Sequence, residues 1–317
     1  MSYNEEKQLI FVKLRSTGQY GDDDSPAATA TNAMVVSNIS HKPLEGNRIS
    51  RDVVKGFMGA PGEIQVTAYV ELSFDVELAG SGDKVTAPAY SPLYHLCGVS
   101  ETITADTSVD YALIDSGYKD GTIYYYCDGA LHKMLGARGS FTMTLGTGGI
   151  PKLSFTLKGL YVAPSAVGAL PAADFSAFTM PTAATSRTIA VFNFFGQPLQ
   201  MSELTVTPGM AVNHLDVTNM EEIEFAGSRA GSVSLKFREP DISVISFYDL
   251  KQNGTPGVLA YQLGTDVTNT GSIFDLNIPA LSVKNVTRSF SDGKSWLQVD
   301  ADITPTAANL DLNWQHR

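Results

Sequence analysis

A stretch near the start of the chain alternates strictly between apolar and polar side chains. From Ile64 to Leu78 the even-numbered residues are apolar, and the odd-numbered ones, such as Glu71 and Asp75, are polar or tyrosine. A period of two over fifteen residues is typical of a β-strand that buries one face. At ~3.3 Å per residue this strand would reach roughly 50 Å, more than one small domain needs. We therefore expect part of it to project or to pair with a neighbouring chain, because an unpaired strand edge favours assembly.

A short α-helix is predicted over residues 91–98. Ser91 is a residue type that caps helix N-termini, Pro92 suits the first helical turn, and Gly98 is a common helix terminator. A β-hairpin is predicted downstream, from Gly139 to Gly159, because alternating apolar residues flank the glycine-rich turn 146–149. The first half is therefore expected to run strand, short helix, hairpin.

The second half repeats this order. A strand is predicted over residues 233–238, a helix opens at Asp241 and ends near Gly254, and a hairpin over 278–303 turns at Asp292-Gly293. The repeated order indicates a degenerate internal duplication.

These elements predict a mainly β protein with two tandem β-barrel or β-sandwich domains, each flanked by a short α-helix. The first covers residues 1–160 with an N-terminal arm and an inserted loop or hairpin near 99–135. Residues 161–188, rich in Ala, Pro, Ser and Thr, are expected to form a linker or extended arm, and residues 189–317 the second domain.

The charge balance argues against a protein that grips nucleic acid. The net charge is −11, and no stripe of Lys and Arg interleaved with aromatic residues occurs. An acidic wall could still let DNA pass without binding it. Charged residues make up only 17%, which indicates a neutral surface suited to burial against partners.

No targeting or membrane segment is predicted. The N-terminal residues MSYNEEKQLIFVKLR are polar and mixed in charge, unlike a secretory signal, and no run of 18 apolar residues occurs. We expect a soluble protein made in the cytoplasm, with no membrane partner. Cys97 and Cys127 are then expected to be free thiols, although a disulfide stays open because the sequence does not give their geometry.

Residues with catalytic or metal-binding potential form no recognisable site. The acidic clusters Asp22–Asp24 and Glu221–Glu224 lack the EF-hand pattern, and the glycines at 146–149 lack the Lys of a phosphate loop. Five histidines are scattered without paired spacing or a nearby cysteine pair: His41, His95, His132, His214 and His316. We predict no catalytic, cofactor-binding or metal-ligating residue, no cofactor and no enzymatic activity, with a pair of glycosidase carboxylates as the catalytic alternative.

Taken together, the segments 70–78, 79–82 and 87–98 resemble the major tail tube proteins of long, flexible-tailed (siphophage-like) bacteriophages. In that family a strand ends in a small glycine-rich loop, followed by Ala-Pro and a Leu-rich helix that closes in Cys-Gly, as in Ala87-Pro88 and Cys97-Gly98 here. The hairpin 139–159 lies where the family has its second strand pair. The resemblance covers about 100 residues of the first half and extends more loosely to 241–250 and 259–265.

The resemblance implies a structural virion protein of the phage tail, assembled in the bacterial cytoplasm. Six such domains form a ring around a lumen, so two domains per chain imply a trimeric, pseudo-hexameric ring, and stacked rings form the tube through which DNA is ejected. Tape-measure, tail terminator and tip proteins are the implied partners. The loop 41–63 and the segment 161–188 are candidates for ring-to-ring contacts, and the face carrying Glu71, Asp75 and Glu77 is the candidate lumen wall.

Two other readings of the residues stay open. A capsid, baseplate or pilus-like β-sandwich shares the composition but not the repeated element order. A carbohydrate-binding module would need clustered surface aromatic residues, for which the run Tyr124–Tyr126 is the candidate.

Overall fold

The computed structural model describes residues 6–54, 56–59, 62–265, 271–307 and 311–317. Within these residues the chain forms 21 β-strands and two short α-helices, so the expected mainly β fold is confirmed. The first half contains β1 (Gln8–Leu14), β2 (Ala33–Met34), β3 (Ser37–Glu45), β4 (Arg48–Ser50), β5 (Glu63–Gln65), β6 (Tyr69–Glu77), α1 (Ser91–Leu96), β7 (Val99–Thr104), β8 (Ser108–Leu113), β9 (Gly121–Cys127), β10 (Ala130–Thr144) and β11 (Lys152–Tyr161). The second half contains β12 (Ser165–Ala166), β13 (Ile189–Phe194), β14 (Met201–Thr207), β15 (Val212–Val217), β16 (Met220–Phe225), β17 (Ser232–Arg238), α2 (Phe247–Asn253), β18 (Gly257–Leu263), β19 (Phe274–Ser291), β20 (Lys294–Ile303) and β21 (Asn313–His316).

Eight antiparallel strands form one continuous sheet across both halves, in the order β3-β6-β11-β10-β14-β17-β20-β19. We call it the long sheet. Its strands alternate buried and half-exposed residues, as the period of two predicts. Only residues 281–291 of β19 belong to it, because the start of β19 pairs with β18 and β21 instead.

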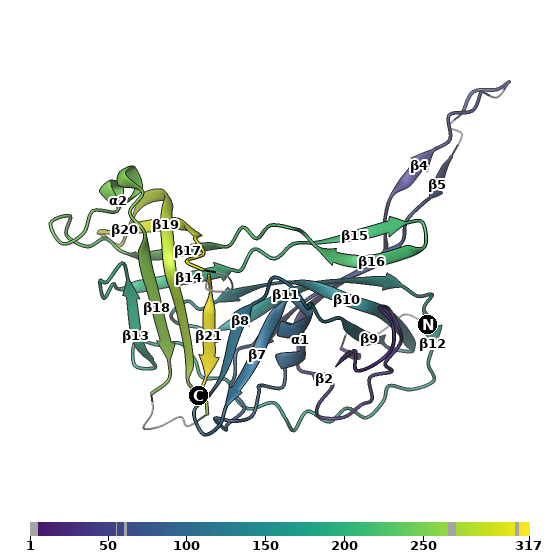
Figure 1. Ribbon diagram of the computed structural model, residues 1–317, viewed down its shortest axis with the longest axis horizontal. Helices are drawn as coiled ribbons and strands as arrows, with labels where there is room; N and C mark the ends of the chain where they lie inside the picture. Colours follow the sequence, from purple (N-terminus) through teal and green to yellow (C-terminus); the bar gives the residue numbers. More distant parts are fainter. Residues whose placement is uncertain (1–5, 55, 60–61, 266–270, 308–310) are drawn as a thin grey trace.

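A second sheet, β7-β8-β21-β19-β18-β13, also draws on both halves (Figure 1). A third branch pairs β2, β1 and β9 with the first residues of β10. Among the described strands these ladders branch at β10 and β19 without closing into a barrel, so the β-sandwich form of the expectation is the one observed.

The core fills the space between the sheets. Phe74, Phe141 and Phe155 lie on neighbouring strands of the long sheet, with Phe155 5.7 Å from Phe141 and 6.0 Å from Phe74 between ring centroids. Tyr94 of α1 and Trp314 of β21 pack onto this group, their rings 5.2 Å apart, and both are buried. One hydrophobic cluster thus spans residues of both halves.

The alternating run 64–78 is not one strand, which corrects the expectation of a continuous fifteen-residue strand. It forms β5 and β6, separated by residues 66–68. One backbone bond persists there, from the Val66 N–H to the Asn47 carbonyl. Beyond it, the side chain of Thr67 accepts a hydrogen bond from the backbone N–H of Asn47, and the side chain of Gln65 donates to the Thr67 carbonyl. The period of two continues past the break because both pieces are extended.

Both predicted helices exist, with corrected starts. Ser91 lies inside α1 and does not cap it, because Tyr90 occupies the N-cap position. The second helix begins at Phe247, six residues after the expected start at Asp241: Asp241 instead accepts hydrogen bonds from Ser243 and closes a separate turn. Ser246 caps α2 by accepting from the backbone N–H of Asp249, and Gly254 ends it in the left-handed conformation.

Both predicted hairpins are confirmed as β10–β11 and β19–β20, the latter turning at Asp292 and Gly293, which both have positive φ. The segment 99–135 contains the hairpin β7–β8, β9 and the start of β10. Residues 161–188 contain the last residue of β11, Tyr161, and otherwise only the short strand β12 among regular elements. The division into domains at 1–160, 161–188 and 189–317 stays a prediction.

Candidate functional site

The polar face of the long sheet carries charges that are matched across neighbouring strands. Glu71, Asp75 and Glu77 lie on this face of β6, as expected, where Glu77 and Glu71 stand opposite Lys152 and Lys158 of β11. Lys42 of β3 also contacts Glu71, with 2.6 Å between Nζ and Oε1. Glu71 and Glu77 therefore have basic residues opposite them, whereas Asp75 accepts hydrogen bonds from the neutral side chains of Ser154 and Asn38.

The second half continues the same pattern. Lys236 Nζ lies 3.3 Å from Glu203 Oε1, and Lys284 Nζ lies 3.2 Å from Asp302 Oδ1. Ser234 donates to Asp300 across β17 and β20, with 2.7 Å between the oxygens. The face is thus a mixed-charge surface rich in hydroxyls, which offers phosphates no continuous positive stripe.

The long sheet ends in two strand edges. At one end β3 pairs with β6 only, and at the other end residues 282–291 of β19 pair with β20 only, as far as the described residues show. Most of the side chains on both edges are exposed. An antiparallel sheet with two such edges can add further strands at either end.

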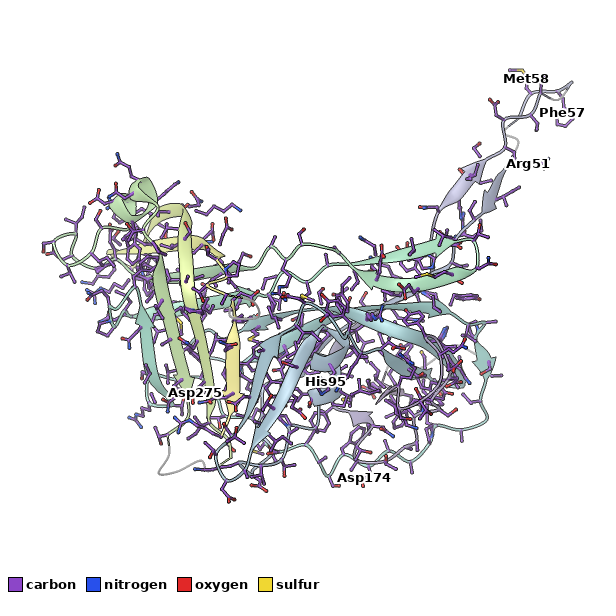
Figure 2. The ribbon with its side chains drawn as sticks, in the orientation of Figure 1. Arg51, Phe57, Met58, His95, Asp174 and Asp275 are labelled. Carbon is purple, nitrogen blue, oxygen red and sulfur yellow. The ribbon has the colours of Figure 1, made fainter. Side chains whose placement is uncertain are left out.

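A narrow arm projects from the β3–β6 hairpin (Figure 1). The short ladder β4–β5 forms its stem, and Phe57 and Met58 lie at its tip, beyond Arg51 (Figure 2). The side chains of Val54 and Met58 are both 101% exposed and that of Phe57 is 72% exposed. Apolar side chains this far from the core mark a surface for contact with another molecule.

The five histidines do not gather into one site. His316 and His95 are buried, His214 of β15 contacts Glu221 of β16, and only His41 and His132 lie together, with ring centroids 4.5 Å apart. Burial, and secondarily the charge of His132, lowers the pKa of His41 to about 4. No cluster of three or more metal-ligating side chains occurs in the described part of the chain.

The acidic clusters also have structural roles. Asp23 accepts hydrogen bonds from Tyr124 and Lys133, and these bonds lower its pKa although partial burial opposes them. Glu222 of β16 lies 3.9 Å from Arg138. The assignment of no catalytic, cofactor-binding or metal residue remains a prediction.

The helix α1 is tied to the β7–β8 hairpin by a half-buried polar cluster. Glu101 accepts hydrogen bonds from Ser91 and Tyr111, and His95 Nε2 lies 4.0 Å from the same carboxylate oxygen (His95 labelled in Figure 2). His95 Nδ1 bonds the Val99 carbonyl at 2.9 Å. Burial lowers the pKa of His95, opposed by this backbone bond. The cluster faces the core and fixes the helix in place.

The aromatic run Tyr124–Tyr126 is part of β9. Tyr124 and Tyr125 are buried, and only Tyr126 is half-exposed, so the run forms no exposed aromatic platform. Cys97 and Cys127 are both free thiols, as expected, and burial raises the pKa of Cys97.

Sequence reasoning missed the β15–β16 hairpin, which crosses from the second half onto the first. Arg138 donates to the Ile223 carbonyl, and Lys158 donates to the Val212 carbonyl. Tyr20 accepts a hydrogen bond from the Ile223 N–H and donates to the Gly136 carbonyl. The alternation Glu222-Ile223-Glu224 was a usable strand signal, because it places the buried Ile223 between two half-exposed acidic residues of β16.

No helix among the described residues is long and apolar enough to cross a membrane. Comparison with curated proteins finds none that matches the chain. The sequence profile of a family described as "phage tail tube protein" matches residues 7–315, nearly the whole chain. This match agrees with the mainly β sandwich, the free sheet edges and the projecting arm, all features of a protein built to assemble. The chain belongs to the phage tail tube protein family.

Proposed function

We propose that this protein forms trimeric, pseudo-hexameric rings that stack into a hollow tail tube through which phage DNA passes. The observation that carries the proposal is the long sheet itself, which consists of two four-stranded units in tandem, β3-β6-β11-β10 and β14-β17-β20-β19. If each unit is one tube domain, three chains supply the six positions of a ring. The domain division near residues 161–188 is part of this proposal.

Ring closure has a clear physical advantage for this chain. Strand direction alternates through all eight strands, so β19 of one copy and β3 of the next would meet antiparallel, as neighbouring strands in the sheet do. Closing the ring removes both unpaired edges. The core sides of the sheet then stay covered, and the part of the mixed-charge polar face that the β15–β16 hairpin does not cover is left to line the lumen.

The matched charges of that face suit a DNA conduit. A wall that gripped phosphates would release counterions and hold the DNA. Because Glu71 and Glu77 lie opposite lysines, the wall offers little net attraction or repulsion. DNA is accordingly a passing cargo of this surface, and tape-measure and terminator proteins are proposed as further partners within the tail.

Stacking of rings is a head-to-tail contact that does not close and therefore forms a filament. The arm is our candidate for this contact because its apolar tip lies far from the core, and residues 161–188 form a second candidate. Val54 and Met58 would become buried against the next ring.

Electron microscopy and native mass spectrometry of the purified protein test the proposal. We expect hollow filaments with a regular axial repeat and an isolated ring with the mass of three chains. A ring of six chains would overturn the trimer, and the absence of rings and filaments under all salts and concentrations would overturn the tube.

A matched pair of variants tests the arm. The double variant V54D/M58D should form rings that fail to stack, because burying two carboxylates at the contact is unfavourable. The control I103D/I242D, which adds the same two charges at exposed apolar positions outside the arm, should form normal filaments. Normal filaments from V54D/M58D would show that the arm tip does not mediate stacking.

A further inference from the structure

The two units of the long sheet carry β-bulges at corresponding places. In the first unit β10 holds one extra residue opposite β11 just before Arg138, and in the second β19 holds one extra residue opposite β20 just before Asn285. A second pair of bulges lies just before Ser40 on β3 and just before Glu203 on β14. When Arg138 is superposed on Asn285, the paired residues can be followed from strand to strand across each unit. This brings Ser40 onto Glu203, so the second two bulges coincide as well. The units can therefore be superposed residue by residue, except that β3 holds one further extra residue between Lys42 and Glu45, so that on this strand the superposition ends at Pro43.

The units meet inside the chain at a seam between β10 and β14. Met143 stands opposite Val206 there, and both side chains are fully buried. The Leu145 N–H donates to the Leu204 carbonyl over 2.8 Å, which extends the ladder beyond the strand ends. On the polar face, the side-chain oxygens of Thr142 and Thr207, also opposite each other in this register, are 3.4 Å apart. The internal seam thus has a defined register and a buried apolar pair.

The outer edge strands of the long sheet, β19 and β3, correspond to β10 and β14, the two strands of the internal seam. Unlike those two, each outer strand lacks a neighbour on one side. The alignment places Phe290 of β19 where Met143 lies in β10, and Ser291 where Thr144 lies. Likewise Lys42 and Pro43 of β3 take the places of Thr205 and Val206 of β14. Phe290 is 76% exposed although its counterpart Met143 is 0% exposed.

We propose that β19 of one copy pairs with β3 of the next copy in the register of the internal seam, with Ser291 opposite Lys42 and Phe290 opposite Pro43. This inference rests on the proposed function, because it describes how the ring closes. Phe290 becomes buried at the subunit boundary, as Met143 is within the chain.

Pro43 explains why this edge does not pair indiscriminately. By the alignment its backbone nitrogen faces outward, in the place of the Val206 N–H, and proline has no N–H to donate. A proline on an edge strand discourages pairing with unrelated strands. The seam therefore depends on the packing of Phe290 as well as on the backbone ladder.

Cysteine cross-linking tests the register directly. Leu145 and Leu204 form a hydrogen-bonded pair, so the neighbouring position of Thr144 and Thr205 is a non-hydrogen-bonded pair, whose closely spaced side chains suit a disulfide. The variant K42C/S291C should, on oxidation of assembled rings, convert almost completely to covalent closed trimers on non-reducing gels. The control K42C/S289C moves one cysteine two residues along the same face of β19 and should cross-link at least tenfold less. The wild-type chain, with its free Cys97 and Cys127, should give no covalent trimer.

The outcomes separate this seam from the tube itself. Rings or tubes in which K42C/S291C stays reduced, or K42C/S289C links better, overturn the seam and leave the tube function standing. A wild-type protein that never forms rings or tubes overturns the tube function and the seam together.

A second variant probes the buried aromatic residue. F290D should abolish ring formation while the monomer keeps the circular dichroism and thermal unfolding of the wild type, because Phe290 contributes little to the monomer core. Rings that form normally with F290D would overturn the burial of Phe290 in the seam.

Discussion

His316 should make the folded chain sensitive to acid, and the substitution H316F should remove that part of the sensitivity. The imidazole is buried on β21 among the rings of Phe274, Tyr111 and Tyr90, at centroid distances of 5.3, 5.9 and 6.3 Å. Neither ring nitrogen has a hydrogen-bond partner within the described structure. Burial therefore lowers the pKa of His316 to about 3.

Acid destabilises the folded chain because the folded and unfolded states bind a proton on His316 at different pH values. In the unfolded chain the pKa is about 6.5, so as the pH falls the unfolded state takes up a proton before the folded state does. The contribution of neutral His316 to stability is complete above pH ~6.5 and is lost progressively down to about pH 3. A pH of 4 lies about 2.5 units below the pKa of His316 in the unfolded chain. At ~1.4 kcal/mol per unit, this difference corresponds to a loss of about 3 kcal/mol in the free energy of unfolding.

Urea unfolding of the dilute monomer at pH 7.5 and pH 4, followed by the fluorescence of the nearby buried Trp314, measures this loss. The wild type should lose about 3 kcal/mol more between the two pH values than H316F, whose ring fills the same space without titrating. The difference isolates His316 from His41 and His132, which titrate equally in both proteins. Equal losses in the wild type and H316F would refute the argument that this imidazole is held neutral by burial.

Three further predictions concern stability. The substitution F155A should lower the free energy of unfolding by about 3–5 kcal/mol, because it opens a cavity at the centre of the core, and urea denaturation would show a smaller loss if the neighbouring rings collapse into the space. S246A should lower it by about 1 kcal/mol through loss of the hydrogen bond to the Asp249 N–H. Y20F should speed amide exchange across β15–β16, since it leaves the Ile223 N–H without its acceptor; unchanged exchange would show that water replaces the hydroxyl.

Much of the fold follows from local patterns that the amino-acid sequence carries openly. The alternation in 64–78 correctly assigns Leu72 and Phe74 to the core and Glu71 and Asp75 to solvent, because a β-strand turns successive side chains to opposite faces. Local residue types also placed the β19–β20 turn at Asp292-Gly293 and the end of α2 at Gly254, because Gly and Asp readily adopt the positive φ that these positions require. The start of α2 was missed because Asp241 and Ser246 are both good capping residues, and only packing of Phe247 against Phe194 selects the later one.

The arrangement of these elements depends on contacts between residues far apart in the chain, which no local pattern encodes. The pairing of β10 with β14, the use of β19 in two sheets and the return of β21 to β8 are settled by burial of a shared core. The candidate surfaces follow the same division. Alternation predicted which face is polar, but the matching of its acids with lysines, and the alignment that points from Met143 to Phe290, arise only when strands stand side by side, because both depend on cross-strand register.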